Sequence, residues 1–350
     1  MKKSLLVSAL GLILLAGAGV FYFYELNKTP VTSTARQLVF EVKPGMSFSA
    51  VAKELKKNGL IRNLDAFRLY ARLTKMDSRL KVGEYALFYN MNADEILQVI
   101  TSGKSIEHNL TFSEGLSTYE MAEVFAKSGL GSYQDFFSLT RNPALAEKLL
   151  GEKLSSLEGY LFPETYKVTK YTKAIDVVTQ MVQRFLQVYP EVLKNSELPG
   201  TWTRHQVVTL ASIIEKETGA AHERPLISSV FHNRLQKNIK LQTDPTIIYG
   251  KAEISGKIVI NITKQDLSTF NRYNTYTIYG LPPGPIANPG KEALQAAVRP
   301  DTSEYIFFVS RNDGTHIFSR TYGEHQKAVD EFQKRRGQVK PAPWRNADGK

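Results

Sequence analysis

Apolar and polar positions divide the chain into one long apolar run and a mixed region that follows it. The run starts at Ser4, ends at Tyr24 and contains no charged residue. A helix rises about 1.5 Å per residue, so this segment reaches about 30 Å, the thickness of the hydrocarbon core of a bilayer. Residues 1–25 are therefore predicted to form a membrane anchor with a short cytoplasmic tip.

Charges at the amino terminus predict the orientation of this anchor. Lys2 and Lys3 precede the apolar run, so the positive-inside rule keeps the amino terminus in the cytoplasm and places the rest of the chain outside. A cleaved signal peptide is the alternative, because the small residues at positions 16–18 follow an apolar stretch. The run continues to Tyr24, beyond the length of a typical signal core, which favours the anchor.

A change of pattern after the anchor predicts a stalk and a small folded unit. Residues 26–37 are polar and contain a proline and several hydroxyl residues, as a stalk would. The next region alternates between strand-like stretches (38–42 and 83–88) and stretches with helical spacing of apolar residues (47–57, 65–73 and 94–100). This order predicts a small α+β unit over residues 38–105.

The longer region that follows, residues 106–340, mixes helical and strand-like stretches without the regular alternation of a doubly wound sheet. Residues 305–310 and 316–319 have strand character, and the turn residues between them predict a hairpin. The fold class predicted for the chain is therefore α+β, with one large second domain. Residues 341–350 are predicted to be a frayed tail.

One apolar helix carries two carboxylates at its end. It is predicted to begin at Thr203, which has capping-box spacing with Gln206, and to end at Gly219. Glu215 and Glu217 lie in its last turn, where burial and the negative end of the helix dipole both raise a carboxyl pKa. A general acid at neutral pH needs such a shift. Helical periodicity does not decide which glutamate faces inward, and an ordinary core helix remains the alternative.

Charge and composition narrow the possible partners only in part. The net charge of +11 is compatible with an anionic partner or with a surface solvated by lysine and arginine. The chain shows no zinc-finger or RNP pattern, so no nucleic acid partner is expected. It contains no cysteine, which excludes disulfides and thiolate metal ligands. No metal and no cofactor are expected.

Several ordered motifs resemble the endolytic murein transglycosylase family, MltG, also called YceG. They are EGYLFPETY (158–166), ASIIEKET (211–218), SVFHNRL (229–235), LQTDPTIIYG (241–250), YNTY (273–276) and GLPPGPI (280–286). The resemblance covers nearly the whole chain, and it is the order of the motifs that makes it specific. It also implies that residues 38–105 are a LysM-like, glycan-binding subdomain and that residues 106–340 are catalytic; a plain spacer is the alternative for the first of these.

The resemblance implies a reaction and the residue that carries it. The family cleaves the β-1,4 bond between N-acetylmuramic acid and N-acetylglucosamine without water and leaves 1,6-anhydro ends. One glutamate acts first as acid and then as base, because the C6 hydroxyl of the sugar is the nucleophile. The family pattern points to Glu217, followed by the hydroxyl residue Thr218, with Glu215 as second choice.

Substrate-binding candidates come from the chemistry of side chains within these motifs. Aromatic rings can lie against sugar faces, and amides and carboxylates can bond hydroxyl and acetamido groups; the candidates are Tyr160, Gln242, Asp244, Tyr249, Asn274 and Tyr276. The structural alternatives are packing for the tyrosines and turn formation for Asp244 and Asn274. Arg234 could meet a carboxylate of the stem peptide or solvate a helix end.

The implied partners are peptidoglycan glycan strands and the inner membrane, with peptidoglycan synthases or division proteins as possible protein partners. Two rival functions stay open. A hydrolytic muramidase would cut the same strands with water, and a non-catalytic scaffold would bind peptidoglycan without cutting it.

Overall fold

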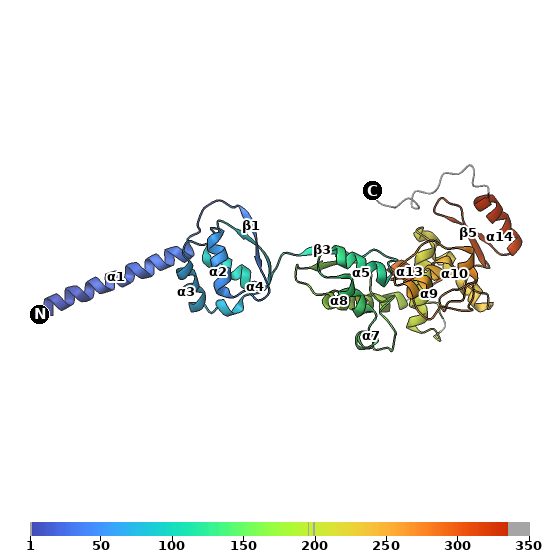
Figure 1. The fold of residues 1–350 in the computed structure, drawn as a ribbon, viewed down its shortest axis with the longest axis horizontal. Coiled ribbons are helices and arrows are strands. Elements are labelled where there is room, and N and C mark those ends of the chain that lie inside the picture. The colour runs from blue at the N-terminus through green and yellow to red at the C-terminus, as the bar shows by residue number, and fades with distance from the viewer. Residues whose placement is uncertain (1, 195, 199, 335–350) are drawn as a thin grey trace. The chain divides into compact units, whose positions relative to one another are not determined.

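The computed structural model describes residues 2–194, 196–198 and 200–334, and these form two compact units. Unit 1 comprises Met1–Asn109 and Lys167–Thr172, and unit 2 comprises Leu110–Tyr166 and Lys173–Lys350. The chain therefore passes between the units three times, and the segment Lys167–Thr172 belongs to unit 1 although it interrupts the sequence of unit 2. Figure 1 labels the main elements of each unit.

Unit 1 begins with the long helix α1 (Lys2–Lys28). Its stretch Leu10–Lys28 is long and apolar enough to cross a membrane and is almost entirely exposed, which agrees with the predicted anchor. At its carboxyl end α1 packs against α3 and α4 of the same unit, and the Lys28 ammonium lies 3.0 Å from the Asp94 carboxylate. The predicted orientation across the membrane stays a prediction.

The rest of unit 1 confirms the predicted order of elements. It contains β1 (Gln37–Val42), α2 (Phe48–Lys57), α3 (Leu64–Leu73), the short 3-10 helix η1 (Asp77–Arg79), β2 (Gly83–Phe88) and α4 (Ala93–Ser102). The two strands pair antiparallel, with Gln37 opposite Phe88 and Val42 opposite Gly83. Each of the three helices after α1 starts at a side-chain cap, from Ser47, Asn63 and Asn92, which satisfies backbone N–H groups that the helix leaves free.

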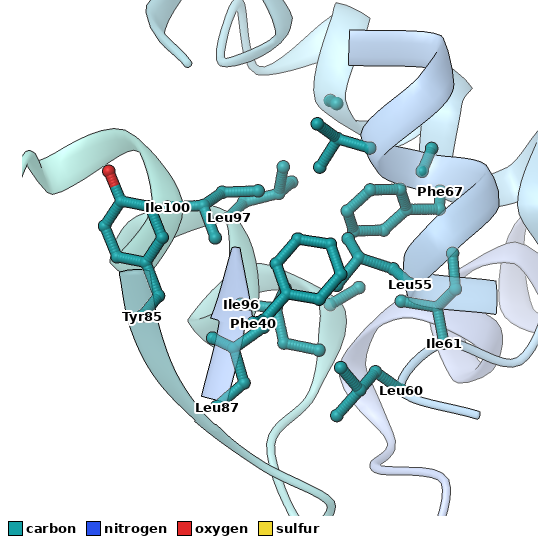
Figure 2. Close-up of a cluster of buried hydrophobic side chains, with 14 of the residues drawn as sticks. Phe40, Leu55, Leu60, Ile61, Phe67, Tyr85, Leu87, Ile96, Leu97 and Ile100 are labelled. Carbon is teal, nitrogen blue, oxygen red and sulfur yellow. The ribbon is translucent and has the colours of Figure 1, made fainter. Parts of the chain in front are cut away.

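A single apolar core holds unit 1 together (Figure 2). Phe40 of β1, Leu55 of α2, Phe67 of α3 and Leu97 of α4 are all at most 4% exposed. These positions follow the two-residue period of a strand and the helical period of the helices, so each element buries one face. The LysM-like character of this unit and its binding to glycans stay predictions.

Unit 2 is mainly helical, with two-stranded sheets. Strand β3 (His108–Thr111) begins in unit 1 and pairs with β4 (Thr165–Val168). The other elements of unit 2 are α5 (Thr118–Lys127), α6 (Tyr133–Thr140), α7 (Pro143–Leu150), α8 (Ala174–Leu193), α9 (Arg204–Glu217), η2 (Ala221–Glu223), α10 (Arg224–Gln236), α11 (Asp244–Ser255), α12 (Lys264–Ser268), α13 (Lys291–Val298), β5 (Phe307–Ser310), β6 (His316–Ser319), α14 (Tyr322–Val329) and η3 (Asp330–Lys334). The antiparallel β5–β6 pair confirms the predicted hairpin. The mixture of helices and strands confirms the α+β class.

Helix α9 lies in the interior of unit 2. It packs against α10, α11 and α13, and its residues 207–214 are all buried. A helix that is apolar on every side must be covered on every side, and this is what the surrounding helices do.

Candidate active site

The beginning of α9 confirms the sequence analysis, whereas its end corrects it. Thr203 caps the helix and forms the predicted capping box with Gln206. The helix ends at Glu217 and not at Gly219, because Thr218 already has extended backbone angles. The Thr218 hydroxyl accepts a hydrogen bond from the Ala220 N–H at 2.9 Å, so a local turn replaces a glycine cap. Glu217 is therefore the last residue of the helix.

A cleft of ≈ 1470 Å³ opens at this end of α9. One wall is the α9 terminus with Glu215 and Glu217, and another is the start of α11 with Asp244. The third wall comes from the β5–β6 hairpin, residues 308–316. His316 of the hairpin donates its backbone N–H to Glu223 at 3.0 Å and places its Nδ1 2.7 Å from the same carboxylate, which fixes the hairpin to the turn after α9.

Glu217 is partly buried in the cleft wall and keeps its proton near neutrality. Burial raises the pKa of Glu217 from 4.5 to about 7, with a smaller contribution from the charge of Asp244. The Thr243 hydroxyl bonds Glu217 Oε1 and opposes that rise. Across the residues that the structure describes, Glu217 Oε2 makes no hydrogen bond. One oxygen is thus held in place while the other is free to meet a ligand.

Glu215, two residues earlier, is fully occupied by the protein. Its side chain is 5% exposed, and its Oε1 lies 3.1 Å from Nη2 of Arg224. Its Oε2 accepts the backbone N–H of Gly290 at 2.9 Å. The guanidinium and the N–H hold the two carboxylate oxygens in place. The arrangement suits Glu215 to joining α9, α10 and the start of α13.

Three of the predicted binding residues lie at or beside the cleft. Asp244 is exposed at the first position of α11 and lines the cleft. The Tyr276 hydroxyl donates to Asp244 Oδ1 at 2.8 Å, and burial raises the pKa of Tyr276. Gln242, two residues before Asp244, is exposed, and its amide oxygen accepts a hydrogen bond from Arg234.

The other three predicted binding residues are buried in the protein. Tyr160 is 0% exposed and its hydroxyl lies 3.0 Å from Nδ1 of His205. The Tyr249 hydroxyl donates to the buried Glu158 carboxylate at 3.0 Å. Asn274 is 1% exposed, and its amide donates to the backbone oxygens of Asp266 and Thr269 at 3.0 and 2.8 Å. Their contacts correspond to the structural alternatives of packing and turn formation.

Sequence reasoning passed over residues that the cleft brings together. Thr243 lies between the candidates Gln242 and Asp244. A threonine before a helix usually caps that helix, so the sequence gave no reason to expect its hydroxyl at Glu217. Glu114 lines the cleft on a loop far away in sequence, and burial together with Glu215 raises its pKa. No sequence motif marked residues 308–316 of the β5–β6 hairpin as part of a site. In the part of the chain that the structure describes, no group of three or more His, Asp or Glu side chains could hold a metal ion.

Comparisons with known proteins identify relatives of this chain. The profile of the YceG-like family matches residues 40–331. The endolytic murein transglycosylase of Bacillus subtilis (strain 168) is 31% identical over 329 residues, which cover 90% of each chain. The endolytic murein transglycosylase of Streptococcus pneumoniae (strain ATCC BAA-255 / R6) is 26% identical over 363 residues, covering 94% of this chain and 65% of its own length.

A solved structure gives the same relationship. The crystal structure of a YceG-like protein from Listeria monocytogenes superimposes with a TM-score of 0.55 at 30% sequence identity, and it covers 84% of this chain and 100% of its own. Together with the profile match over most of the sequence, this shows that the chain belongs to the YceG-like family.

Proposed function

We propose that this protein is an endolytic lytic transglycosylase that cleaves peptidoglycan glycan strands with Glu217 as its single acid and base. The observation that carries the proposal is the state of Glu217: a carboxyl with a pKa of about 7, at a cleft, with one oxygen bonded by Thr243 and the other without a partner in the described residues. The names of the relatives, endolytic murein transglycosylases, support the substrate class.

The proposed reaction needs one carboxyl group. Glu217 gives its proton to the oxygen that bridges N-acetylmuramic acid and N-acetylglucosamine, and the bond from the muramic C1 to this oxygen breaks. The C6 hydroxyl of the same muramic residue then bonds to C1 and returns a proton to Glu217. The products are a 1,6-anhydro end and a free hydroxyl, and the enzyme regains its starting state. A pKa near the working pH suits a group that must both donate and accept.

The cleft offers further groups that would hold the substrate. Asp244 is exposed, and the Tyr276 hydroxyl lies beside it and donates to its carboxylate. We propose that these two and Gln242 bond sugar hydroxyl or acetamido groups. Tyr249 and Asn274 are proposed to support the wall from within, because the polar group of each bonds the protein. Tyr160 bonds His205 at the other end of α9 and is proposed to support that helix.

The proposed location follows from the anchor. Helix α1 would hold the enzyme in the inner membrane, and Lys2 and Lys3 at its start would keep the amino terminus in the cytoplasm. Units 1 and 2 would then act outside, where nascent glycan strands are made and where synthases and division proteins work.

Replacement of Glu217 by Gln tests the proposal directly. The amide keeps the size of the side chain but has no proton to give, so we expect release of glycan fragments to fall at least about a hundredfold. The measurement is mass spectrometry of muropeptides released from purified peptidoglycan. It also separates cleavage by the C6 hydroxyl from hydrolysis, since an anhydro end is lighter than a reducing end by one water.

Two matched carboxyl-to-amide changes serve as controls. Glu197→Gln alters a side chain that is 57% exposed and should leave the rate unchanged. Glu215→Gln should lower the melting temperature, because it weakens the bonds to Arg224 and Gly290, while folded protein still forms anhydro products. Parent-like release by Glu217→Gln would remove the assignment of Glu217 as the acid, absence of release by the parent would favour the scaffold, and reducing ends alone would favour the muramidase.

A further inference from the structure

Thr243 directs its hydroxyl away from the helix that it precedes. It occupies the N-cap position of α11, where threonine normally bonds a backbone N–H of the first turn. Here it makes no such bond, and its hydroxyl goes to Glu217 Oε1 instead. The residue is 2% exposed, so solvent does not compete for the hydroxyl. Helix α11 thus forgoes a stabilising cap in favour of a contact with the proposed acid.

The turn that carries Thr243 has an unusual backbone. Gln242 has a φ of +54°, a left-handed conformation that is costly for a residue with a side chain. Its N–H donates to Thr275 O at 3.2 Å, and the Thr243 N–H donates to the Thr275 hydroxyl at 3.0 Å. Leu241 is buried just before. Such a conformation persists only where surrounding contacts over-determine it.

Arg234 of α10 supplies those contacts. Its Nε donates to Lys240 O at 2.9 Å, its Nη2 donates to the Gln242 amide oxygen, and its Nη1 donates to Ile306 O at 2.8 Å. The residue is 6% exposed, and no carboxylate pairs with it anywhere in the described chain. Burying a guanidinium without an opposite charge is costly. Each of its three nitrogens already donates to an acceptor within the protein, and the side chain is buried, so it is not placed to meet a carboxylate of the stem peptide.

We propose that Arg234 and Thr243 form a positioning pair for Glu217, in which the guanidinium holds the turn 240–243 and the turn holds the Thr243 hydroxyl against one carboxyl oxygen. The inference rests on the proposed catalytic role of Glu217. Neither residue touches the substrate. Arg234 acts through the turn, and Thr243 acts through the carboxyl group.

The pair has two consequences for the proposed acid. A fixed Oε1 leaves Oε2 as the oxygen that points to the cleft and exchanges the proton. A hydroxyl that donates to the carboxylate also favours its charged form, which helps Glu217 to act as a base after it has acted as an acid.

The titratable groups near this end of α9 bond other partners, whereas Thr243 bonds the Glu217 carboxyl. Asp244 on α11 raises the pKa of Glu217 and accepts from Tyr276. The remaining charged groups around the cleft are paired or held elsewhere: Arg224 of α10 with Glu215 and Glu292, Lys216 with Gly115 O, His316 of β6 with Glu223, Glu114 beside Arg224, and Asp313 of the hairpin with Thr315. Thr243 is the group among these that bonds the Glu217 carboxyl itself.

The first test replaces Thr243 by Val, which keeps the shape and removes the hydroxyl. Loss of the donor should raise the Glu217 pKa, so the alkaline limb of the rate–pH profile should move up by about one pH unit. The rate at the optimum should fall about tenfold, because the carboxyl loses its orientation and its base form. Thr243→Ser keeps the hydroxyl and should restore both within about twofold.

The second test replaces Arg234 by Lys, which keeps the charge but cannot bond three acceptors at once. We expect the same direction of shift and about a threefold to tenfold fall in rate. The double variant with Thr243→Val should be no worse than Thr243→Val alone, within about twofold, because both act on one contact. Arg320→Lys, at a side chain that is 60% exposed, is the matched control and should leave the profile unchanged.

The outcomes separate this inference from the proposed function. An unshifted limb and a parent-like rate in Thr243→Val would overturn the pair, even when Glu217→Gln is inactive. A lower melting temperature in Arg234→Lys with an unshifted limb would make Arg234 a purely structural residue and remove its part. Activity that survives in Glu217→Gln would instead remove the proposed function on which the inference rests.

Discussion

Two carboxyl groups that stand two residues apart in one helix meet opposite surroundings. Glu215 is enclosed by Arg224 and the Gly290 N–H, whereas Glu217 has a neutral hydroxyl and a nearby negative charge from Asp244. A cation and an N–H stabilise a carboxylate, and burial without a cation destabilises it. The difference in partners therefore gives the two residues different chemistry despite their common helix.

The raised pKa of Glu217 predicts how stability depends on pH. The folded protein binds the Glu217 proton with a pKa of about 7, against 4.5 for an ordinary glutamate, so the folded state holds more protons than the unfolded state between these values. Stability from this group is therefore full below pH 4.5 and is lost as the pH rises through 7. At pH 8 the Glu217→Gln variant should be more stable than the parent by about 1–3 kcal/mol.

Thermal unfolding of both proteins from pH 4 to pH 8 measures this effect without any assay of activity. The two curves should meet at low pH and separate above about pH 5. A constant difference between parent and variant across this range would contradict the raised pKa. Glu197→Gln reports the effect of removing an exposed charge.

Periodicity and capping signals predicted most elements. Residues 47–57 of the sequence analysis correspond to α2 and residues 83–88 to β2, because each buries one face at the period of its own secondary structure. Residues 316–319 correspond to β6, which the turn residues before it indicated. The choice between Glu215 and Glu217 could not be predicted in this way, since their partners Arg224, Gly290 and Thr243 come from other elements. Likewise, nothing in the pattern around Tyr160 or Asn274 distinguished a sugar contact from a core position.

The core of unit 1 gives a prediction at the level of a helix. Phe67 of α3 is 1% exposed and lies in the apolar core (Figure 2). It stacks on Phe48 with ring centroids 5.7 Å apart. Phe67→Ala should cost unit 1 about 3–5 kcal/mol of unfolding free energy, because it removes buried surface and leaves a cavity.

Hydrogen exchange of the β2 and α4 amides in the detergent-solubilised protein measures this loss. Leu73→Ala on the same helix is the control, since Leu73 is 66% exposed and should change stability by about 0.5 kcal/mol or less. Equal exchange rates in the two variants would contradict the proposed contribution of Phe67 to the core.

The two units of the molecule share one chain that crosses between them three times. The returning segment Lys167–Thr172 is held in unit 1 by its own contacts: the Lys170 ammonium lies 2.9 Å from Glu41 and 3.3 Å from Glu84, and the Tyr171 hydroxyl donates to Glu41. The sequence of unit 2 is therefore interrupted by a segment that belongs to unit 1 and has its partners there.

A shortened protein that begins at Leu110 tests this arrangement. Without Glu41 and Glu84, the Lys167–Thr172 segment loses its ion pairs, so trypsin should cut after Lys170 at least about tenfold faster than in the full chain. Digestion followed by mass spectrometry gives both rates, and cleavage after the exposed Lys257 serves as the internal control. Equal rates at Lys170 would mean that unit 2 holds the segment unaided.

This threading also bears on how such a protein can change during evolution. A module that is joined to its neighbour by one linker can be gained or lost in one recombination event. Unit 1 cannot, because a deletion that ends at Asn109 leaves Lys167–Thr172 behind. A descendant that discards unit 1 must acquire a second, independent change that shortens the connection from Tyr166 to Lys173.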